Sequence, residues 1–384
     1  MVPGSTSMSV GCGVGTRPGG RVRAIVMVAL VVMGVSSCET FQFYRQAVGG
    51  QLSIARAAEP ADELIASDHT EAALKARLEA VADDLRFARE HLGLDPGARY
   101  TSYVRVAGDY VVWNVFAAPE FSTSPKRWCY PFVGCASYRG YFDRRDARGY
   151  AAQLAMEQHD TVVGGVAAYS TLGWFDDPVL STFVTWPDPD LAGLIFHELA
   201  HAKLYIPGDT SFNEAFASFV ERQGLVEWLR ARDDDATVQQ MMMRWRAGDR
   251  FVAYLLRWRD ELQHLYDQPY DRTALRLLKA ELLQEVERCY RSNQAVFGDQ
   301  EWFFRKSPNN AGFVPLAAYH ERLVGFAGLF EHSGGSWPAF YRDAARLGRL
   351  SDQSRNAELD RLGRDFEAEH AAVVAQVQCD ALAF

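Results

Sequence analysis

The segment His-Glu-Leu-Ala-His at residues 197–201 holds the side chains with the clearest chemistry in this sequence. His197 and His201 are four residues apart, so on a helix both imidazoles project from one face and can bind one Zn²⁺. Glu198 lies beside them without pointing at the same coordination position, which makes it the candidate general base. Apolar neighbours supply the buried flank of such a helix: Leu194, Ile195, Leu199, Ala202 and Leu204.

A catalytic zinc site needs a third protein ligand and an open position for water, whose pKa the metal lowers to about 7. Glu214 is the best candidate for this ligand, because it opens a second predicted helix after the loop 207–210 and could fold back onto the metal. Asp209 is the second candidate. A different interpretation also stays open, in which Ser211 and Glu214 form a capping box that closes the N-terminus of the helix.

Hydrolysis of a peptide bond passes through a tetrahedral oxyanion, which needs a hydrogen-bond donor besides the metal. The candidate donors are Tyr205, four residues beyond His201; Tyr319, in a later predicted helix; and Tyr169, on the strand expected to border the substrate cleft. The alternative for each tyrosine is an ordinary amphipathic residue in the wall of the cleft, without a catalytic role. The sequence does not locate a carboxylate for the free ammonium of an aminopeptidase substrate.

The elements that must position these residues follow from the spacing of apolar side chains. Before the motif we expect helices at residues 39–60, 70–92 and 144–158, a hairpin of strands 100–107 and 110–116 that turns at Gly108-Asp109, and a strand with its loop at 161–172. From residue 190 onward the pattern is almost entirely helical, at residues 190–206, 211–232, 236–266, 271–294, 311–330, 337–348 and 355–376. The expected fold class is α+β, mostly α, with a small N-terminal β-sheet and a large helical part.

Longer strings resemble a known family. The HELAH motif followed by Asn-Glu-Ala-Phe-Ala at residues 213–217 looks like the HExxH and NExxA pairing of the gluzincins. The strings WCYPFVGCASYRGYFD, AYSTLGWFDDP and FNEAFASFVE resemble a family of bacterial lipoproteins described as putative aminopeptidases, from about Cys38 into the C-terminal third. The metzincin pattern is excluded, because Leu204 stands where that family needs Gly.

This resemblance implies one Zn²⁺ held by His197, His201 and Glu214, with Glu198 as base, in a zincin-like core whose strand lies along the substrate cleft. The implied function is aminopeptidase hydrolysis of a peptide or protein substrate. Two alternatives remain: an endopeptidase of the same zincin type, and an envelope scaffold or assembly factor with a structural or vestigial zinc site. A closed structural site needs a fourth protein ligand, and the sequence offers none nearby, which favours catalysis.

The N-terminus predicts the compartment. Three arginines precede the apolar run 24–35, as in a signal peptide, and this run is too short to span a bilayer as a helix. Val35-Ser36-Ser37-Cys38 resembles the lipobox of bacterial lipoproteins, in which cleavage exposes a cysteine that carries the lipid. The alternative is a soluble secreted protein. In bacterial lipoproteins of Gram-negative cells, a residue other than Asp after the lipidated cysteine favours transport to the outer membrane. Here that residue is Glu39.

The expected organisation is therefore a signal peptide at residues 1–37, a tether at 38–60 and a single metallopeptidase domain at 61–384. Within that domain, residues 61–189 form the helix and sheet part, and residues 190–384 form the helical part with the metal site. We expect a lipid-anchored protein on the periplasmic side of the bacterial cell envelope. The sequence does not predict the oligomeric state.

Cysteines and charge add two further expectations. Cys129 and Cys135 flank a short turn-like stretch and are expected to form a local disulfide in an oxidising compartment. For Cys289 and Cys379 the sequence leaves a disulfide and buried thiols equally open. The net charge is −9, and the 40 Lys and Arg are scattered among 49 Asp and Glu. The basic residues are not clustered into a surface that could bind a phosphate backbone, so nucleic acid is not an expected partner.

Overall fold

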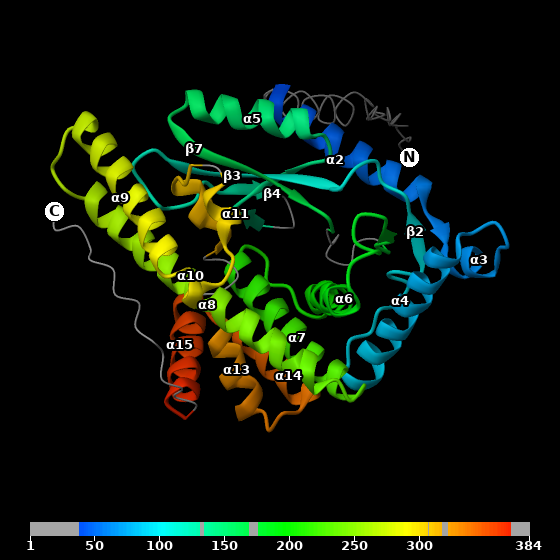
Figure 1. Ribbon diagram of the computed structural model, residues 1–384. Coiled ribbons are helices and arrows are strands. Elements are labelled where there is room, and N and C mark those ends of the chain that lie inside the picture. Colours follow the sequence, from blue (N-terminus) through cyan, green and yellow to red (C-terminus); the bar gives the residue numbers. More distant parts are fainter. Residues whose placement is uncertain (1–37, 131–133, 169–175, 306, 317–321, 370–384) are drawn as a thin grey trace, which may run out of the picture. The chain divides into compact units, whose positions relative to one another are not determined.

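The computed structural model describes residues 38–130, 134–168, 176–305, 307–316 and 322–369 (Figure 1). By its internal contacts the chain divides into two units, of which the first ends at Gly49 and the second begins at Gly50. Helix α2 (Cys38–Ala57) holds the described part of the first unit and continues into the second. All other described elements belong to the second unit. No helix in the described ranges is long and apolar enough to cross a membrane.

The strands of the second unit form small sheets. One sheet has the order β1-β2-β8, with β1 (Glu59–Pro60), β2 (Ser102–Val104) and β8 (Val179–Leu180). Another has the order β6-β3-β7, with β6 (Arg139–Tyr141), β3 (Val112–Pro119) and β7 (His159–Val166). A pair is formed by β4 (Trp128–Tyr130) and β5 (Gly134–Ala136). Because β7 pairs only with β3 among the described strands, it is an edge strand.

The predicted hairpin at residues 100–116 is wrong. The chain does turn at Gly108, where φ is +96°, but the two runs that flank this turn enter different sheets. β3 pairs antiparallel with β7 in an unbroken register from Val112–Val166 to Pro119–His159, whereas β2 pairs parallel with β8. A long pairing with a distant strand therefore outweighs the local turn signal, because β-strand preference depends on the partners that packing supplies.

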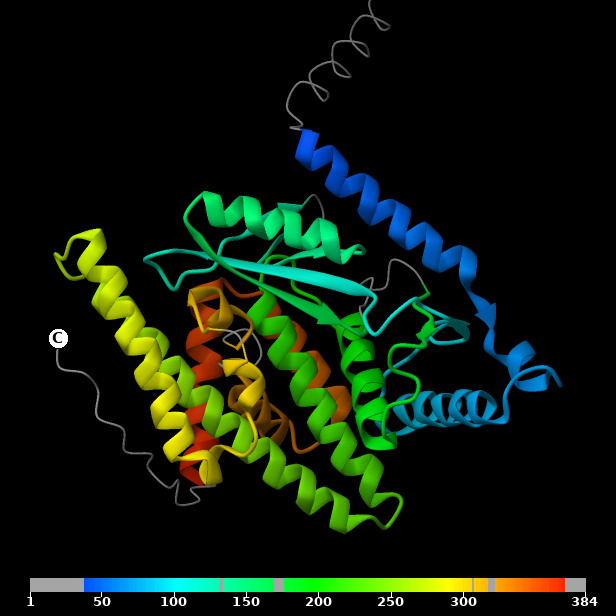
Figure 2. The same ribbon diagram turned by 45° about the horizontal axis from the view of Figure 1, so that its top comes forward.

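Helices make up most of the second unit, and α5 (Arg144–Met156) packs on β3 and β7 (Figure 2). The remaining helices are α3 (Ala61–Ala66), α4 (Ala72–His91), α6 (Asp188–Lys203), α7 (Thr210–Arg230), α8 (Asp235–Tyr266), α9 (Arg272–Ser292), α10 (Gln294–Phe297), α11 (Glu301–Phe304), η1 (Asn310–Phe313), α13 (Leu323–His332), α14 (Trp337–Gly348) and α15 (Asp352–Glu369). The fold class α+β, mostly α, is confirmed.

Most of the predicted helices are found within a few residues of their expected bounds. The helix expected at 311–330 differs, because the chain there forms the 3₁₀ turn η1 and the separate helix α13. The short helices α10 and α11 were not predicted, since four residues are too few to show a helical period. The end of the last predicted helix, beyond residue 369, lies outside the described residues.

Two hydrophobic cores hold the helices. The larger core buries one side of α6 and most of α7 against α4, α13 and α14, and its members include Phe196, Phe216 and Phe340. The smaller core joins α8 and α9 with the segment 297–316, around Trp258 and Tyr290. Since α6 and α7 are packed into the larger core, the side chains on their remaining faces have fixed positions.

Candidate metal centre

Helix α6 carries His197, Glu198 and His201. Asp188 and Asp190 lie in its first turn and Pro189 at its start, three features that favour a helix N-terminus. The two imidazoles stand one turn apart with ring centroids separated by 4.8 Å. Leu204, with φ of −150°, ends the helix in an extended conformation, so the chain turns away immediately after the second histidine.

Helix α7 brings Glu214 to the same place. Asp209 caps this helix, with Oδ1 accepting a hydrogen bond of 3.0 Å from the backbone N–H of Phe212. Asn213 fixes the preceding loop: its Oδ1 accepts from the N–H of Ile206 at 2.8 Å, and its Nδ2 donates to the carbonyl of Ile206 at 2.9 Å. Because α6 and α7 pack against each other, Glu214 is held against the histidine face, with only 8% of its surface exposed.

The structure therefore brings His197, His201 and Glu214 together as a cluster that could hold a metal ion. The two Nε2 atoms lie 3.1 Å apart, and Glu214 Oε2 lies 3.5 Å from His197 Nε2 and 3.6 Å from His201 Nε2. Ligand atoms placed about 2.0–2.1 Å from a tetrahedral zinc ion are separated from one another by roughly 3.3 Å. The observed separations are close to that value.

Buried polar atoms at the cluster support the same interpretation. Glu214 Oε2 and Glu198 Oε2 are both buried and have no hydrogen-bond partner among the described residues. A buried carboxylate oxygen without such a partner costs free energy unless a proton or a cation offsets it. A divalent cation bound among these donors would offset the negative charge of the buried carboxylates. The residues present therefore fit a metal ion.

Sequence reasoning missed Glu221, which supports the cluster. Its Oε2 lies 3.0 Å from Nδ1 of His197, so the ring can donate to this carboxylate while Nε2 faces the cluster. A carboxylate in this position fixes the ring orientation and the tautomer of a metal-binding histidine. Glu221 follows Glu214 by two helical turns, a spacing that places both residues on one side of α7, and this was the available signal.

The pKa shifts of Glu198 and Glu214 have opposite directions. Burial raises the pKa of Glu198, and the imidazoles of His201 and His197 only partly oppose it. For Glu214, burial also acts to raise the pKa, but contacts with His197 and His201 outweigh burial and hold the pKa well below the usual range. Glu214 is thus ionised and poised to bind a cation.

Of the predicted oxyanion donors, Tyr169 and Tyr319 lie outside the described residues. Tyr205 lies near the cluster, since burial and then the charge of Glu214 raise the pKa of its phenol. Tyr138, between β5 and β6, was missed from the sequence: burial raises its pKa, and the charges of Glu214 and Glu198 raise it further. Both tyrosines therefore remain neutral hydrogen-bond donors close to the cluster.

The alternatives for Asp209 and Ser211 are contradicted by the structure. Asp209 is the cap of α7, and its carboxylate also accepts from Arg322 at 3.0 Å and from Arg355 at 2.6 Å. These contacts use both oxygens of Asp209, so it is not a ligand at the cluster. The cap position belongs to Asp209 rather than Ser211, so Glu214 does not close a capping box.

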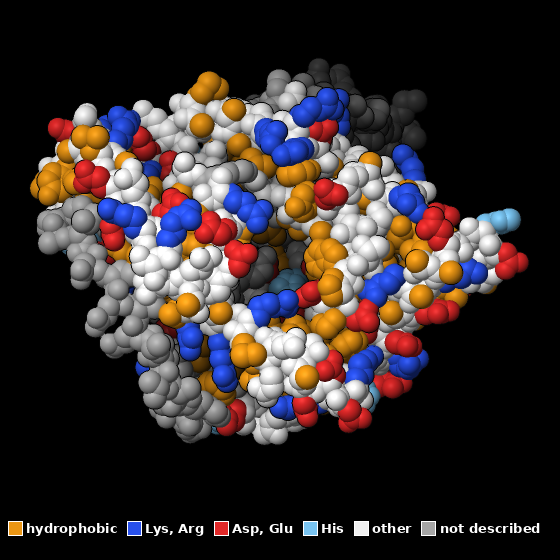
Figure 3. Space-filling view, in the orientation of Figure 1, with side chains coloured by type: hydrophobic (Ala, Val, Ile, Leu, Met, Phe, Trp, Pro, Cys, Tyr) orange, Lys and Arg blue, Asp and Glu red, His pale blue; other side chains and the backbone are white. Residues whose placement is uncertain are grey.

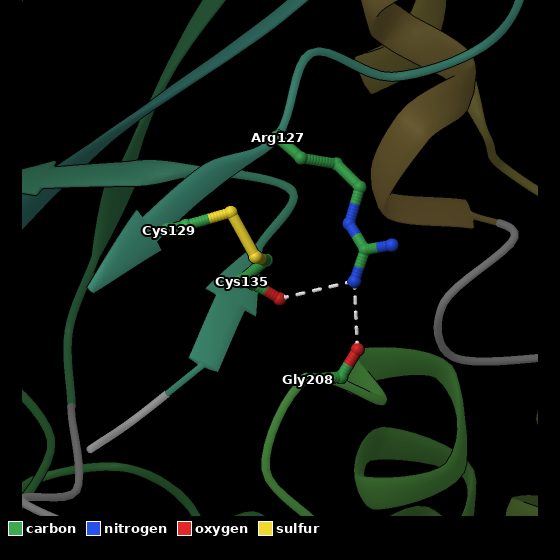
Figure 4. The surroundings of a disulfide bond; sticks show 4 residues. All are labelled: Arg127, Cys129, Cys135 and Gly208. Carbon is green, nitrogen blue, oxygen red and sulfur yellow. Dashed lines mark hydrogen bonds between the residues drawn. A yellow bond between two sulfur atoms is a disulfide. The ribbon is translucent and has the colours of Figure 1, made fainter. Parts of the chain in front are cut away.

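A disulfide hairpin packs against the loop that precedes α7. Cys129 and Cys135 are directly opposite in the β4–β5 pair and are joined by a disulfide (Figure 4). Arg127 Nη2 donates to the carbonyl of Gly208 at 2.7 Å and lies 3.5 Å from that of Cys135. Any Cβ at Gly134 would lie 2.6 Å from the backbone N of Gly208, so this close approach requires glycine. Cys289 is also disulfide-bonded, and Cys379, whose pairing with it the sequence left open, lies outside the described residues.

A cavity of about 690 Å³ opens beside the cluster and is bordered by His197 and Glu198. Figure 3 shows a hollow in one face of the molecule with a histidine side chain at its floor. The end of the edge strand β7 and the chain after it, Gly165 to Ala168, form one wall. The volume is within the range of pockets that bind small ligands.

One of three comparisons with known proteins identifies a family. A family model described as "Putative aminopeptidase" matches residues 42–359, a span that includes His197, Glu198, His201 and Glu214. Neither the curated proteins nor the solved structures gave a significant match to the chain. Since the family model covers well over half of the 384 residues, the chain belongs to the family described as Putative aminopeptidase.

Proposed function

We propose that this protein is a zinc-dependent peptidase of the aminopeptidase kind, in which His197, His201 and Glu214 hold one Zn²⁺ and Glu198 is the general base. The observation that carries the proposal is the cluster itself: three donor atoms from two helices, 3.1–3.6 Å apart, with a buried carboxylate oxygen that has no hydrogen-bond partner among the described residues. When bound, Zn²⁺ acts as a Lewis acid that polarises the scissile carbonyl and acidifies water.

The residues of the chain do the remaining work. Glu198 borders the cavity, so it can accept a proton from the attacking water and later donate it to the leaving amine. Glu221 keeps His197 in the tautomer whose Nε2, directed at His201 and Glu214, can bind a cation. Tyr205 and Tyr138 are the described candidates for the donor that stabilises the oxyanion, because both phenols lie near Glu214.

An enzyme fits this site better than a scaffold with a structural metal. A structural zinc site is closed by four protein ligands, whereas a catalytic site keeps one position open. The described residues supply one cluster of three or more metal-binding side chains, and it has three members. The cavity beside it leaves room for a substrate at the fourth position.

The test combines metal analysis with an unbiased peptide mixture that contains free and blocked N-termini. We expect about one zinc per chain, and hydrolysis that stops on chelation and returns with Zn²⁺. Release of N-terminal residues supports an aminopeptidase, and internal cleavage supports the endopeptidase alternative. A protein with one tightly held zinc and no hydrolysis of any peptide would leave the scaffold alternative.

We also propose that the mature protein begins at Cys38 and is tethered by lipid on that residue to the outer membrane, on the periplasmic side. The support is the sequence Val35-Ser36-Ser37-Cys38 after a basic and apolar leader. Lipid attached to a cysteine provides a membrane anchor without a spanning helix, although stable anchoring takes more than one acyl chain.

A further inference from the structure

The cavity beside the cluster has walls of two kinds. Apolar side chains from α6, α7, α8 and the segment before α6 line part of it: Trp186, Pro187, Leu194, Leu225 and Met241. Charged side chains line it as well: Asp190, Glu198, Glu221 and Arg244. A pocket with apolar walls and a few placed polar groups selects a ligand by an apolar part and orients it by a polar part.

The acidic residues that line this cavity are not equivalent. Asp190 Oδ1 lies 2.9 Å from Arg244 Nη2, so its charge is offset by a residue of the same cavity. Glu198 is the proposed base. Glu221 borders the cavity as well, and 34% of its side chain is exposed.

The two oxygens of Glu221 have different surroundings. Oε2 accepts from His197 Nδ1, while Oε1 lies over Gly193, where an added Cβ would be 3.5 Å away. Oε1 is therefore the oxygen of Glu221 that can accept a hydrogen bond from a cationic group of a ligand in the cavity.

We infer that Glu221 binds the free α-ammonium of the substrate and that the apolar walls accept its first side chain, so the substrates are peptides with an apolar N-terminal residue. Glu221 is separated from the cluster by one imidazole ring, and an α-ammonium is separated from the first carbonyl carbon by one Cα atom. In a bound peptide the ammonium would contact Glu221 while the first peptide bond lies at the cluster. This inference rests on the proposed function.

The test uses the full-length, zinc-loaded protein and two matched substrates, a leucyl amide and its N-acetyl derivative with the same leaving group. The variant Glu221→Gln keeps an acceptor for His197 Nδ1–H but removes the charge. The control is Glu227→Gln, which makes the same change on α7 outside the cavity lining, where Glu227 accepts from Trp337 Nε1 at 3.1 Å.

We expect Glu221→Gln to raise KM for the leucyl amide by about 10- to 100-fold, with kcat less affected, because one charge-assisted hydrogen bond is lost. At equal zinc content the variant should lose most of the wild type's preference for the leucyl amide over its N-acetyl derivative, because any effect through His197 acts on both substrates alike. Calorimetry gives a second readout that needs no variant: leucinamide should bind the wild type more tightly than N-acetylleucinamide.

Other outcomes overturn the inference in distinguishable ways. If the wild type hydrolysed and bound the free and the acetylated ligands equally well, the ammonium site would be rejected. The proposal of a zinc peptidase would stand. Equal loss on both substrates together with loss of zinc in Glu221→Gln would assign Glu221 a positioning role only. A wild type that holds zinc and hydrolyses neither substrate, nor any peptide in the mixture, would remove the proposed function and this inference together.

Discussion

His197 and Glu214 stand on different helices, yet Nε2 of the histidine lies 3.5 Å from Oε2 of the glutamate. This approach depends on the loop between α6 and α7, where Asn213 makes two hydrogen bonds to the backbone of Ile206. A cation that binds both residues would link the two helices further. Metal binding and the position of α7 should therefore stabilise each other.

The first prediction concerns the ligands. His201→Ala or Glu214→Ala should lower the zinc content sharply from about one per chain, because each change leaves only two protein ligands. Elemental analysis of the purified proteins measures this. The control is His264→Ala, which removes an exposed histidine of α8. Full zinc retention in both ligand variants would contradict the assignment.

The second prediction separates the base from the ligands. Glu198→Gln should keep the zinc and lower kcat/KM by roughly 10²- to 10⁴-fold, because only proton transfer is removed. Steady-state rates on one peptide substrate, compared at equal zinc content, measure the loss. A variant that works near the wild-type rate would show that Glu198 is not the base.

The helices and the histidine pair could be predicted from the sequence because their signals are local. His197 and His201 are four residues apart, and an α-helix alone places them on one face. The third member, Glu214, needed the further expectation that two consecutive helices pack together, which α6 and α7 do. The fold class followed from the apolar spacing in the same way.

Features that depend on tertiary contacts could not be predicted. The predicted hairpin at Gly108 is wrong because β3 pairs over its whole length with the distant strand β7, in a register that joins Val112 to Val166, 54 residues later. Tyr138 comes near Glu214 only because the β4–β5 hairpin packs on the loop at Gly208, a contact that no periodicity encodes.

The third prediction concerns the disulfide hairpin. Replacing both Cys129 and Cys135 with Ser should lower the free energy of unfolding by about 2 kcal/mol, the loop-closure value for so short a loop. Urea denaturation without reductant measures the difference. Adding a reductant, which also breaks the disulfide of Cys289, should abolish the difference between the wild type and the double variant. Identical wild-type curves with and without reductant would contradict this prediction.

The fourth prediction concerns pH. Asp84 on α4 is only 3% exposed; it accepts from Trp228 Nε1 at 2.8 Å and lies 4.0 Å from Arg232 Nη2. Burial raises its pKa to about 7 from a usual value of 3.8. Between those two values the folded state binds one more proton than the unfolded state, so stability falls as pH rises, by at most about 1.4 kcal/mol per pH unit.

Asp84→Asn should remove this loss, because the amide keeps an acceptor for Trp228 and carries no charge. Above pH 7 the variant should be the more stable protein, and below pH 4 the two should converge. The measurement is urea denaturation at several pH values from 4 to 8. Asp83→Asn, an exposed neighbour on the same helix, is the control and should follow the wild type. Parallel profiles for wild type and Asp84→Asn would rule out this origin of the pH dependence.

The last prediction concerns the membrane. Cys38 should carry lipid, and Cys38→Ala should release the protein from the membrane fraction, because the described helices include none that is long and apolar enough to span a bilayer. The measurement is fractionation of both proteins with metabolic labelling by a fatty-acid analogue. Ser37→Ala is the matched control, since it alters the neighbouring residue and keeps the thiol. An unlabelled wild type, or a Cys38→Ala protein processed to the same mature form, would leave the soluble secreted protein as the remaining interpretation. Label that follows the thiol while the protein sediments with the inner membrane would keep the lipid and reject only the outer-membrane placement that Glu39 favours.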